Sequence, residues 1–395
     1  MPSITIGPPA TGDDFFDRET LLEDLWEAVD EGSVLLAAPR RVGKTSLMLR
    51  MRDQSPENWA VLYIEAEGFS TAEELVADLI VKVVKAQPGL QRFLKGILSG
   101  LISRLEELEI WEVRLKLREH LRGRWKERGM QAIHEVLSVS PHCLLLIDEL
   151  SILLHQLGAE PEGSQEAVAL LHWLRGLRQE FAGRTSMVLG SSVGIGRIAA
   201  HLGASRTLND LRQMEVGAFD PATAQRFAEL LLKSRGLEVD DETKYAILSQ
   251  VETYVPIFVQ IMVDALSKEV RNRNVKPDPG LVRWCYEERV HGPEFRTYFE
   301  DYYERLNRYY TPNEARAAKR ILRDLSMSER GVNRFALYDA VMHELGPVGE
   351  PEQFDLLLAA LENDFYVTVG NMEERVTFHN KWLRDWWRRY HGLGS

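Results

Sequence analysis

The chain has 395 residues, 60 of them acidic and 48 basic, and a formal net charge of −12. This length suggests two or three domains, and the acidic balance argues against a surface coated for nucleic acid, although it leaves room for one basic face. A hydrophobic content of 45% excludes wholesale disorder, and two cysteines without paired spacing argue against a zinc site or a disulfide framework. The absence of a leader-like start and of a long apolar run predicts a cytoplasmic protein with no membrane partner.

The first part of the chain is predicted to alternate strands and helices. A helix is expected to begin at Thr20, whose hydroxyl could cap it, and to stop at Gly32. Short strands are predicted at 33–37, which is continuously apolar, and at 59–65, 143–147, 186–189 and 211–216, with helices from about Lys44 and over 71–86. This alternation is typical of a parallel sheet covered by helices on both faces.

Residues 88–141 interrupt the alternation and are predicted to be an insertion. Residues 93–102 have helical apolar spacing, whereas residues 110–117 alternate apolar and basic side chains as a strand would. Residues 114–128 form the most basic stretch of the chain and could contact a nucleic acid or an acidic partner. A solvated face is the favoured interpretation, because acidic residues interleave with the basic ones.

The second part of the chain is predicted to be mainly helical. Helices over 221–232, 241–251 and 256–268 indicate a small helical domain. An aromatic stripe at 295–310 favours core packing over base stacking. The last predicted elements are helices near 314–325, 335–345 and 351–362 and a ribbon at 365–369 and 375–378. Three helices followed by a hairpin are typical of a winged helix-turn-helix.

The segment from Ala38 to Ser46 has the spacing of a phosphate-binding loop, with alanine at the motif's usual first glycine. Such a loop points backbone N–H groups at a phosphate, Gly43 permits close approach, and the following helix adds the positive end of its dipole. Lys44 would contact the β- and γ-phosphates, and the Thr45 hydroxyl would bind Mg²⁺. The predicted nucleotide-binding residues of this loop are Pro39, Arg40, Arg41, Val42, Gly43, Lys44, Thr45 and Ser46.

Two more polar groups follow predicted strands. Asp148 and Glu149 end an apolar run, where Asp148 would hold Mg²⁺ through its water shell and Glu149 would polarise the attacking water. A surface cap is the alternative, but two adjacent carboxylates favour chemistry. Ser191 and Ser192 end the next strand, and either could sense the γ-phosphate or orient the water, with a plain turn as the alternative.

Together these motifs resemble the archaeal-type predicted ATPases of the AAA+/STAND class, which are related to the origin-recognition initiator ATPases. The resemblance rests on residues 15–19, 39–46, 146–149, 190–192 and 383–387. It implies an α/β fold, with an AAA+-like P-loop NTPase parallel sheet, a helical insertion, an all-α lid and a C-terminal winged-helix domain. The implied domains are 1–218 with the insertion at about 88–141, the lid at 219–292, and a linker helix with the winged helix at 293–395.

The resemblance also assigns residues around the base. Phe16 would lie near the adenine, in a box where Asp17 replaces the family's usual glycine, and Pro256 of the lid would abut the base or ribose. The first turns of the lid helix that begins at Pro256 contain no arginine, so no sensor 2 arginine is identifiable. This favours a switch over a processive motor.

Other residues have a structural and a functional interpretation. Arg197 and Arg206 could supply an arginine finger in a homo-oligomer, although surface salt bridging is favoured for each. His379 could reach the β-phosphate of ADP, as in STAND proteins, although a structural role is favoured. The tryptophans of residues 382–387 are better explained by docking onto the body of the protein than by reading bases.

The sequence therefore predicts an ATPase with ATP, ADP and Mg²⁺ as ligands. It would be a Mg²⁺-dependent, ATP-hydrolysing switch that passes its nucleotide state through the lid and the winged helix to a protein partner. The alternative is an ATP-licensed initiator or loader whose winged helix binds duplex DNA, against which the acidic net charge counts. A non-hydrolysing scaffold is disfavoured by the paired carboxylates at 148–149.

Overall fold

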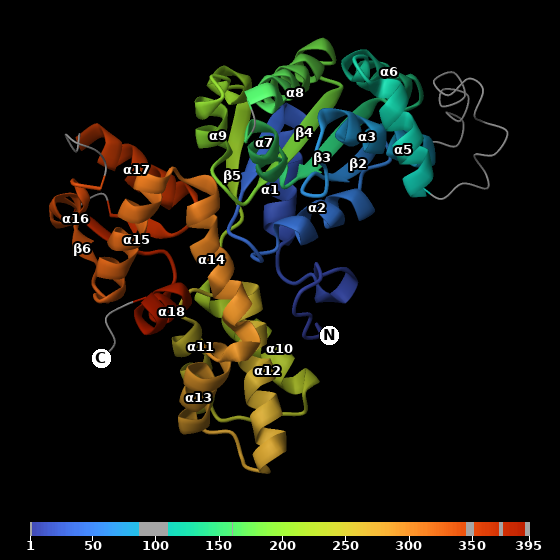
Figure 1. Cartoon of the computed structure of the whole chain (residues 1–395). Helices are drawn as coiled ribbons and strands as arrows, with labels where there is room; N and C mark the ends of the chain where they lie inside the picture. The colour runs from blue at the N-terminus through green and yellow to red at the C-terminus, as the bar shows by residue number, and fades with distance from the viewer. Residues whose placement is uncertain (1, 87–109, 160, 345–350, 371–373, 392–395) are drawn as a thin grey trace. The chain divides into compact units, whose positions relative to one another are not determined.

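The computed structural model describes residues 2–86, 110–159, 161–344, 351–370 and 374–391 of the chain (Figure 1). The chain forms two compact units. The first consists of residues 18–40 and 44–216, and the second of residues 1–17, 41–43 and 217–395. Within the described ranges, no helix has the length and apolar content that crossing a membrane requires.

The first unit is built on a five-stranded parallel sheet. Its strands are β1 (Ser33–Ala37), β2 (Trp59–Glu65), β3 (His142–Asp148), β4 (Thr185–Ser191) and β5 (Leu211–Glu215), in the order β2-β3-β4-β1-β5. All five predicted strands are confirmed. Because the strands are parallel, the carboxyl ends of β3, β4 and β1 lie side by side at one edge, the edge where ligands of open α/β sheets bind.

Helices cover both faces of this sheet, which explains why the central strands β3, β4 and β1 are buried along nearly their whole length rather than at alternate residues. Cys143, Leu145 and Ile147 of β3 belong to one core with the helices on their side, and the side chains between them point to the opposite face. The helices of that core include α3 (Ala72–Ala86), α5 (Ile110–Leu121), α6 (Trp125–Val139), α7 (Leu150–Gly158), α8 (Pro161–Glu180) and α9 (Ile195–His201). The buried side chains of α1 (Glu19–Glu31) and α2 (Lys44–Asp53) lie outside that core.

The predicted cap of the first helix is wrong, although the helix itself and its stop at Gly32 are confirmed. Helix α1 begins at Glu19, so Thr20 lies inside the first turn, where its hydroxyl cannot reach forward as a cap. Arg18 occupies the N-cap position and makes no capping bond through its side chain.

The predicted strand at 110–117 is also wrong, because these residues begin helix α5. Leu117 and Leu121 are buried one helical turn apart, whereas Leu115, which an alternating pattern would bury with Leu117, is exposed. The packing of α5 against α3 therefore buries residues at helical spacing, and the alternation of apolar and basic residues in the sequence does not decide the structure here. The predicted helical spacing at 93–102 lies outside the described residues.

The basic character of α5 is partly neutralised by α3. Arg114 lies 2.7 Å from Asp78, and Arg118 lies 2.5 Å from Glu74. The two arginines are one turn apart, as are the two carboxylates, so the helices pair turn by turn. These two basic residues of α5 therefore pair with acidic residues of the same chain.

The second unit is mostly helical. Its first helices are α10 (Pro221–Ser234), α11 (Asp241–Val251), α12 (Pro256–Arg273), α13 (Pro279–Cys285) and α14 (Arg296–Tyr309). Asp220 and Asp240 cap α10 and α11 by accepting backbone N–H bonds, as the helix-start signals require. The aromatic side chains of α14 are largely buried, and the prediction of core packing for this stripe is confirmed.

The end of the second unit combines helices with a small antiparallel sheet. Its elements are α15 (Pro312–Ser326), β6 (Val332–Asn333), α16 (Arg334–Val341), α17 (Pro351–Asn363), β7 (Val367–Val369), β8 (Arg375–Phe378) and α18 (Lys381–His391). The predicted three helices and ribbon are present, and the sequence missed β6, which pairs with β8 in the order β6-β8-β7. A strand of two residues has too short a pattern to be recognised.

The tryptophans of α18 pack into the second unit, which confirms the prediction of docking. Trp382 stacks on Phe258 of α12 with ring centroids 4.3 Å apart, and its indole N–H donates to the carbonyl of Gln250 at 2.9 Å. Trp386 stacks on Phe299 of α14. Both indoles are buried and therefore not available to nucleic-acid bases.

Candidate active site

The predicted phosphate loop joins β1 directly to α2. Gly43 has a φ of 109°, a conformation that residues with a side chain rarely adopt, so glycine is required immediately before the helix. Ala38, at the motif's usual first glycine, is buried, has no positive φ, and donates its N–H to the Ser191 carbonyl at 3.1 Å. Alanine therefore fits the backbone at the start of the loop.

Lys44, the first residue of α2, lies between two carboxylates. Its Nζ is 2.7 Å from Oε1 of Glu149 and 3.1 Å from Oδ1 of Asp148, and its side chain is only 4% exposed. A buried ammonium is costly unless it is paired, and these contacts pair it twice. The strand–loop–helix segment thus brings its lysine to the carboxyl end of β3, as the motifs require.

Asp148, the last residue of β3, is held by several donors. Its Oδ2 accepts from the Thr45 hydroxyl at 2.6 Å and from the Tyr63 hydroxyl at 3.4 Å, and its Oδ1 accepts from the Glu149 N–H at 3.0 Å. With Lys44 beside Oδ1, both carboxylate oxygens of Asp148 have partners, which fixes the orientation of a side chain that is only 2% exposed. The predicted metal-binding pair, Thr45 and Asp148, is in direct contact.

Tyr63 of β2 is a site residue that the sequence analysis missed. Burial, and then the charge of Asp148, raise the pKa of the Tyr63 phenol well above its usual range, so the hydroxyl stays protonated and remains a donor. A tyrosine inside an apolar strand is the signal that could have drawn attention to it. Only the pairing of β2 with β3 brings this hydroxyl to the carboxylate.

Gly190 of β4 makes room for the carboxylate. A Cβ at this position would lie 2.6 Å from Oδ1 of Asp148 and 2.8 Å from the terminal methyl of Met48. The glycine of the Gly-Ser-Ser segment is therefore set by close approach rather than by a turn. Any larger residue would push Asp148 out of its present position.

Glu149 follows Asp148 in a left-handed conformation, with a φ of 53°. This conformation is uncommon for a residue with a side chain and is typical of functional positions. The carboxylate accepts from Lys44 through Oε1 and from the Ser192 hydroxyl through Oε2, at 2.7 Å in each case. The Ser191 hydroxyl instead donates to the Val193 carbonyl. Of the two predicted serines, only Ser192 is shown bonding to Glu149.

No protein-family model matches the chain, and no curated protein matches it. A solved Walker-type ATPase of Pyrococcus abyssi is similar over 98% of this chain and 99% of its own, with a TM-score of 0.63 and 17% identity. The ORC2 protein of Aeropyrum pernix, in ADPNP-ADP complexes, is similar over 95% of this chain and 92% of its own, with a TM-score of 0.53 and 13% identity. The chain has the AAA+ P-loop fold. At these identities the similarity concerns the fold, and the chemistry rests on the residues described above.

The base-binding residues that the AAA+ resemblance implies lie in the second unit. Phe16 stacks on Phe227 with ring centroids 5.1 Å apart. Asp17 has a φ of 51°, the conformation that the family's usual glycine would adopt without strain. Its carboxylate accepts from the Thr223 hydroxyl and, at 2.8 Å, from Arg226. These bonds hold an aspartate in a conformation that aspartate tolerates better than most residues.

The remaining predicted residues lie elsewhere in the two units. Arg40 is paired with Glu67 at 3.3 Å, on the surface of the first unit. Arg197 lies on α9, and Arg206 lies in a short 3-10 helix that follows it. His379 follows β8, where its ring is half-buried beside Phe365, and burial lowers its pKa.

Proposed function

We propose that this chain is a Mg²⁺-dependent ATPase that acts as a nucleotide-controlled switch. The observation that carries the proposal is the contact of Lys44 with Asp148 and Glu149, at 3.1 and 2.7 Å, where a phosphate-loop helix begins beside the last residue of β3. A lysine, a metal-binding aspartate and a glutamate in this arrangement are the groups that phosphoryl transfer to water requires.

Residues 39–46 would hold the phosphates, with backbone N–H groups and the start of α2 supplying positive partial charge. The phosphate oxygens of ATP offer Lys44 the same kind of anionic partner that the two carboxylates offer. The ammonium can therefore exchange partners without becoming an unpaired buried charge. Phe16 and Pro256 are proposed to contact the base.

Thr45 and Asp148 fit a magnesium ion. Both present oxygen atoms, the donor type that Mg²⁺ prefers, and their 2.6 Å contact brings these oxygens together at one edge of the sheet. The absence of a side chain at Gly190 leaves the Asp148 carboxylate its space. When bound, Mg²⁺ would neutralise charge on the β- and γ-phosphates.

Glu149 is proposed to accept the proton of the attacking water. Its Oε1 would become available when Lys44 turns to the phosphates, and the Ser192 hydroxyl would hold Oε2 and orient the carboxylate. Ser191 is proposed to shape the turn and to place Ser192. Arg197 or Arg206 could complete such a site in a homo-oligomer by supplying charge to the γ-phosphate.

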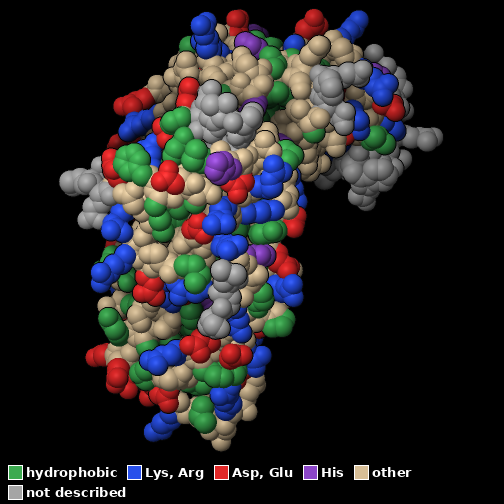
Figure 2. Space-filling model, turned by 60° about the vertical axis from the view of Figure 1, so that its left-hand side comes forward, with side chains coloured by type: hydrophobic (Ala, Val, Ile, Leu, Met, Phe, Trp, Pro, Cys, Tyr) green, Lys and Arg blue, Asp and Glu red, His purple; other side chains and the backbone are tan. Residues whose placement is uncertain are grey.

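The proposed output is a protein partner, reached through a lid at 219–292 and a winged helix at 293–395. In that winged helix α17 takes the place of the recognition helix, and it contains acidic residues but no Lys or Arg. Phe335 of α16 and Leu356 of α17 are exposed. On the face seen in Figure 2, basic and acidic side chains are interspersed. These features suit a protein surface better than a DNA backbone.

ATP turnover by a Glu149→Gln variant tests the proposal. We expect turnover to fall about 100-fold or more, because a general base contributes about 10²–10⁴-fold, while ATP binding persists. The matched control is Glu57→Gln, at an exposed position outside the site, which should hydrolyse ATP like the parent. Equal turnover by Glu149→Gln and the parent would contradict the proposal.

The alternative of an ATP-licensed, DNA-binding initiator has its own test. Fluorescence anisotropy with duplex DNA at two salt concentrations should give a steep salt slope if phosphate contacts are made. We expect no binding at low salt from a surface whose candidate recognition helix is acidic.

A further inference from the structure

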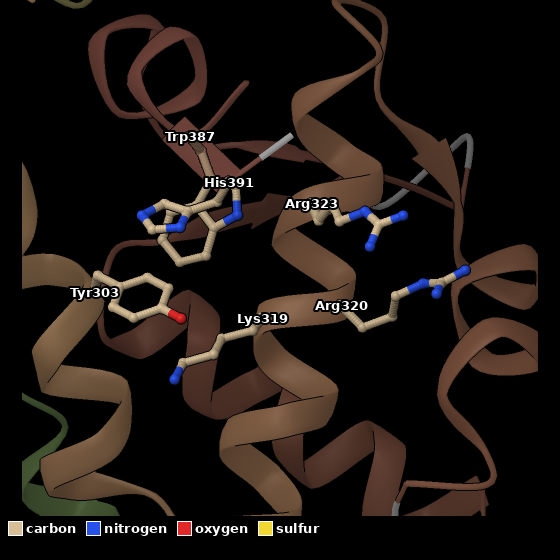
Figure 3. Close-up of a pocket in the computed structure, with 6 residues that line it drawn as sticks. All are labelled: Tyr303, Lys319, Arg320, Arg323, Trp387 and His391. Carbon is tan, nitrogen blue, oxygen red and sulfur yellow. The ribbon is translucent and has the colours of Figure 1, made fainter. Parts of the chain in front are cut away.

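A small pocket opens at the end of the second unit, and none of its lining residues belongs to α17. Its volume is about 230 Å³, and it lies among α14, α15 and α18. The lining residues are Tyr303, Lys319, Arg320, Arg323, Trp387 and His391. Figure 3 shows the rings of Tyr303, Trp387 and His391 on one side and the helix that carries the three cations on the other. None of these lining residues is acidic, although the chain as a whole has a net charge of −12.

The three cations differ in how they are engaged. Lys319 donates to the side-chain oxygen of Asn307 at 2.5 Å and lies 4.3 Å from the centre of the Tyr303 ring. Arg320 pairs with Asp324 one turn along the helix, at 3.2 Å. The guanidinium of Arg323 has no hydrogen-bond or ion-pair partner in the part of the chain that the structure describes. One full positive charge therefore stands uncompensated at the pocket.

The aromatic side of the pocket offers a further donor. Trp387 is fully buried, and its indole N–H has no hydrogen-bond partner among the described residues. A buried donor without an acceptor costs about 1–3 kcal/mol, so a ligand oxygen at this position would be favoured. His391 stacks on Tyr303 with ring centroids 4.2 Å apart, which fixes the wall beside the indole.

We propose that this pocket binds a phosphate group of a small molecule. Three cations and an unpartnered N–H are all donors, and a phosphate presents several acceptor oxygens with a double negative charge. The volume lies below the roughly 300–1,000 Å³ of pockets that enclose drug-sized ligands, so it suits a phosphate or a small phosphate ester rather than a whole nucleotide. Arg320 and Arg323 extend away from the rings in Figure 3 and would swing toward the anion, as long surface side chains do within nanoseconds.

This site is separate from the proposed ATP site, because its residues belong to α14, α15 and α18 of the second unit. It also differs from a duplex DNA site, since its cations lie on α15 rather than on α17. The inference does not depend on ATP hydrolysis and can be tested in a Lys44→Ala background, where phosphate binding at the loop before α2 is impaired.

The experiment is calorimetric titration of full-length Lys44→Ala protein with inorganic phosphate and, separately, with glycerol phosphate. We expect one or both to bind, and Arg323→Gln to weaken binding at least 10-fold. Arg316→Gln is the matched control on the same helix, since Arg316 is exposed, bonds to Asn313 and lies outside the pocket, and it should bind like the parent. The stronger of the two ligands identifies the source of the phosphate.

A second readout guards against variants that fail to fold. The indole N–H resonance of Trp387, assigned by its loss in Trp387→Phe, should shift on addition of the phosphate compound. An unmoved Trp387 resonance, equal affinity of Arg323→Gln and the parent, or binding of duplex DNA without binding of either phosphate compound would each overturn the proposal.

Discussion

Two aspartates of the first unit are equally buried, but their cations differ. Asp148 and Asp78 are each 1% exposed. The cation of Asp148 is Lys44, whose side chain is 4% exposed, whereas Asp78 pairs with Lys82 and Arg114, whose side chains are 31% and 37% exposed. Asp78 joins α5 to α3 through partners that also reach water. Asp148 pairs with Lys44, which is too buried to be solvated by water and therefore needs an anion as its partner. A phosphate-binding site requires a cation of this kind.

The comparison shows that the cost of a buried ion pair depends on which partner is removed. In the Asp78 cluster, loss of both cations leaves a buried carboxylate unpaired, which is strongly destabilising, whereas loss of the carboxylate leaves partly exposed cations that water can solvate. In the Asp148 cluster the cation is itself buried, so loss of either partner leaves a buried charge with fewer partners. The first three tests below examine the two clusters in order of expected effect.

The largest effect on stability is expected from removing both cations of Asp78. The double variant Lys82→Gln/Arg114→Gln leaves that carboxylate buried and unpaired, and we expect a loss of about 3 kcal/mol in the free energy of unfolding, measured in urea. Adding Asp78→Asn should recover most of the loss. ATP affinity should stay near that of the parent, because neither cation reaches Asp148. If the triple variant Lys82→Gln/Arg114→Gln/Asp78→Asn is no more stable than the double variant, the loss does not come from an unpaired Asp78 carboxylate, which would contradict this account.

Gly190→Ala sharpens the comparison on the Asp148 side. The added Cβ would lie 2.6 Å from the Asp148 carboxylate, and we expect a loss of about 1–3 kcal/mol in stability together with a higher Mg²⁺ requirement for ATP binding. Gly176→Ala in α8 is the control, because a Cβ there meets nothing within 4 Å and alanine favours the helix. A Gly190→Ala protein with unchanged stability and Mg²⁺ dependence would refute the close approach.

The smallest effect is expected from Arg114→Gln alone. Lys82 remains beside Asp78 at 2.8 Å, so the carboxylate keeps one cation, and the loss should be about 1 kcal/mol or less. Hydrogen exchange should quicken in α5 and not in β3. Arg122→Gln, at an exposed position without an ion pair in the described part of the chain, should leave exchange unchanged. A loss as large as that of the double variant would show that Lys82 does not compensate Asp78.

The strands and the phosphate loop could be predicted because their signals are local. Five short segments gave the five strands of the sheet, although the edge strand β5 (Leu-Arg-Gln-Met-Glu) is not an apolar run, and the spacing from Ala38 to Ser46 placed the turn between β1 and α2. Strands that are buried on both faces indicate a parallel sheet, and in a parallel sheet the carboxyl ends of neighbouring strands lie at the same edge. The position of the site at that edge could therefore be predicted. The prediction that Lys44, Asp148 and Glu149 come together needed no contact information beyond these patterns.

The features that the sequence did not predict depend on which elements are neighbours. Residues 110–117 alternate like a strand, and only their packing on α3 shows that the helical repeat decides. Tyr63 and Gly190 matter because β2 and β4 flank β3, an order that no single strand encodes. Asp78 is likewise unremarkable until α5 supplies Arg114.

ATP binding in the presence of Mg²⁺ tests the central claim most directly, by comparing the parent with Lys44→Ala and with Lys85→Ala as an exposed-lysine control. At a nucleotide concentration about 100 times the dissociation constant, the parent and the control should gain about 2.7 kcal/mol in unfolding free energy. Lys44→Ala should gain little, because the ammonium that would pass from the two carboxylates to the phosphates is gone. An equal gain in all three proteins would contradict the account.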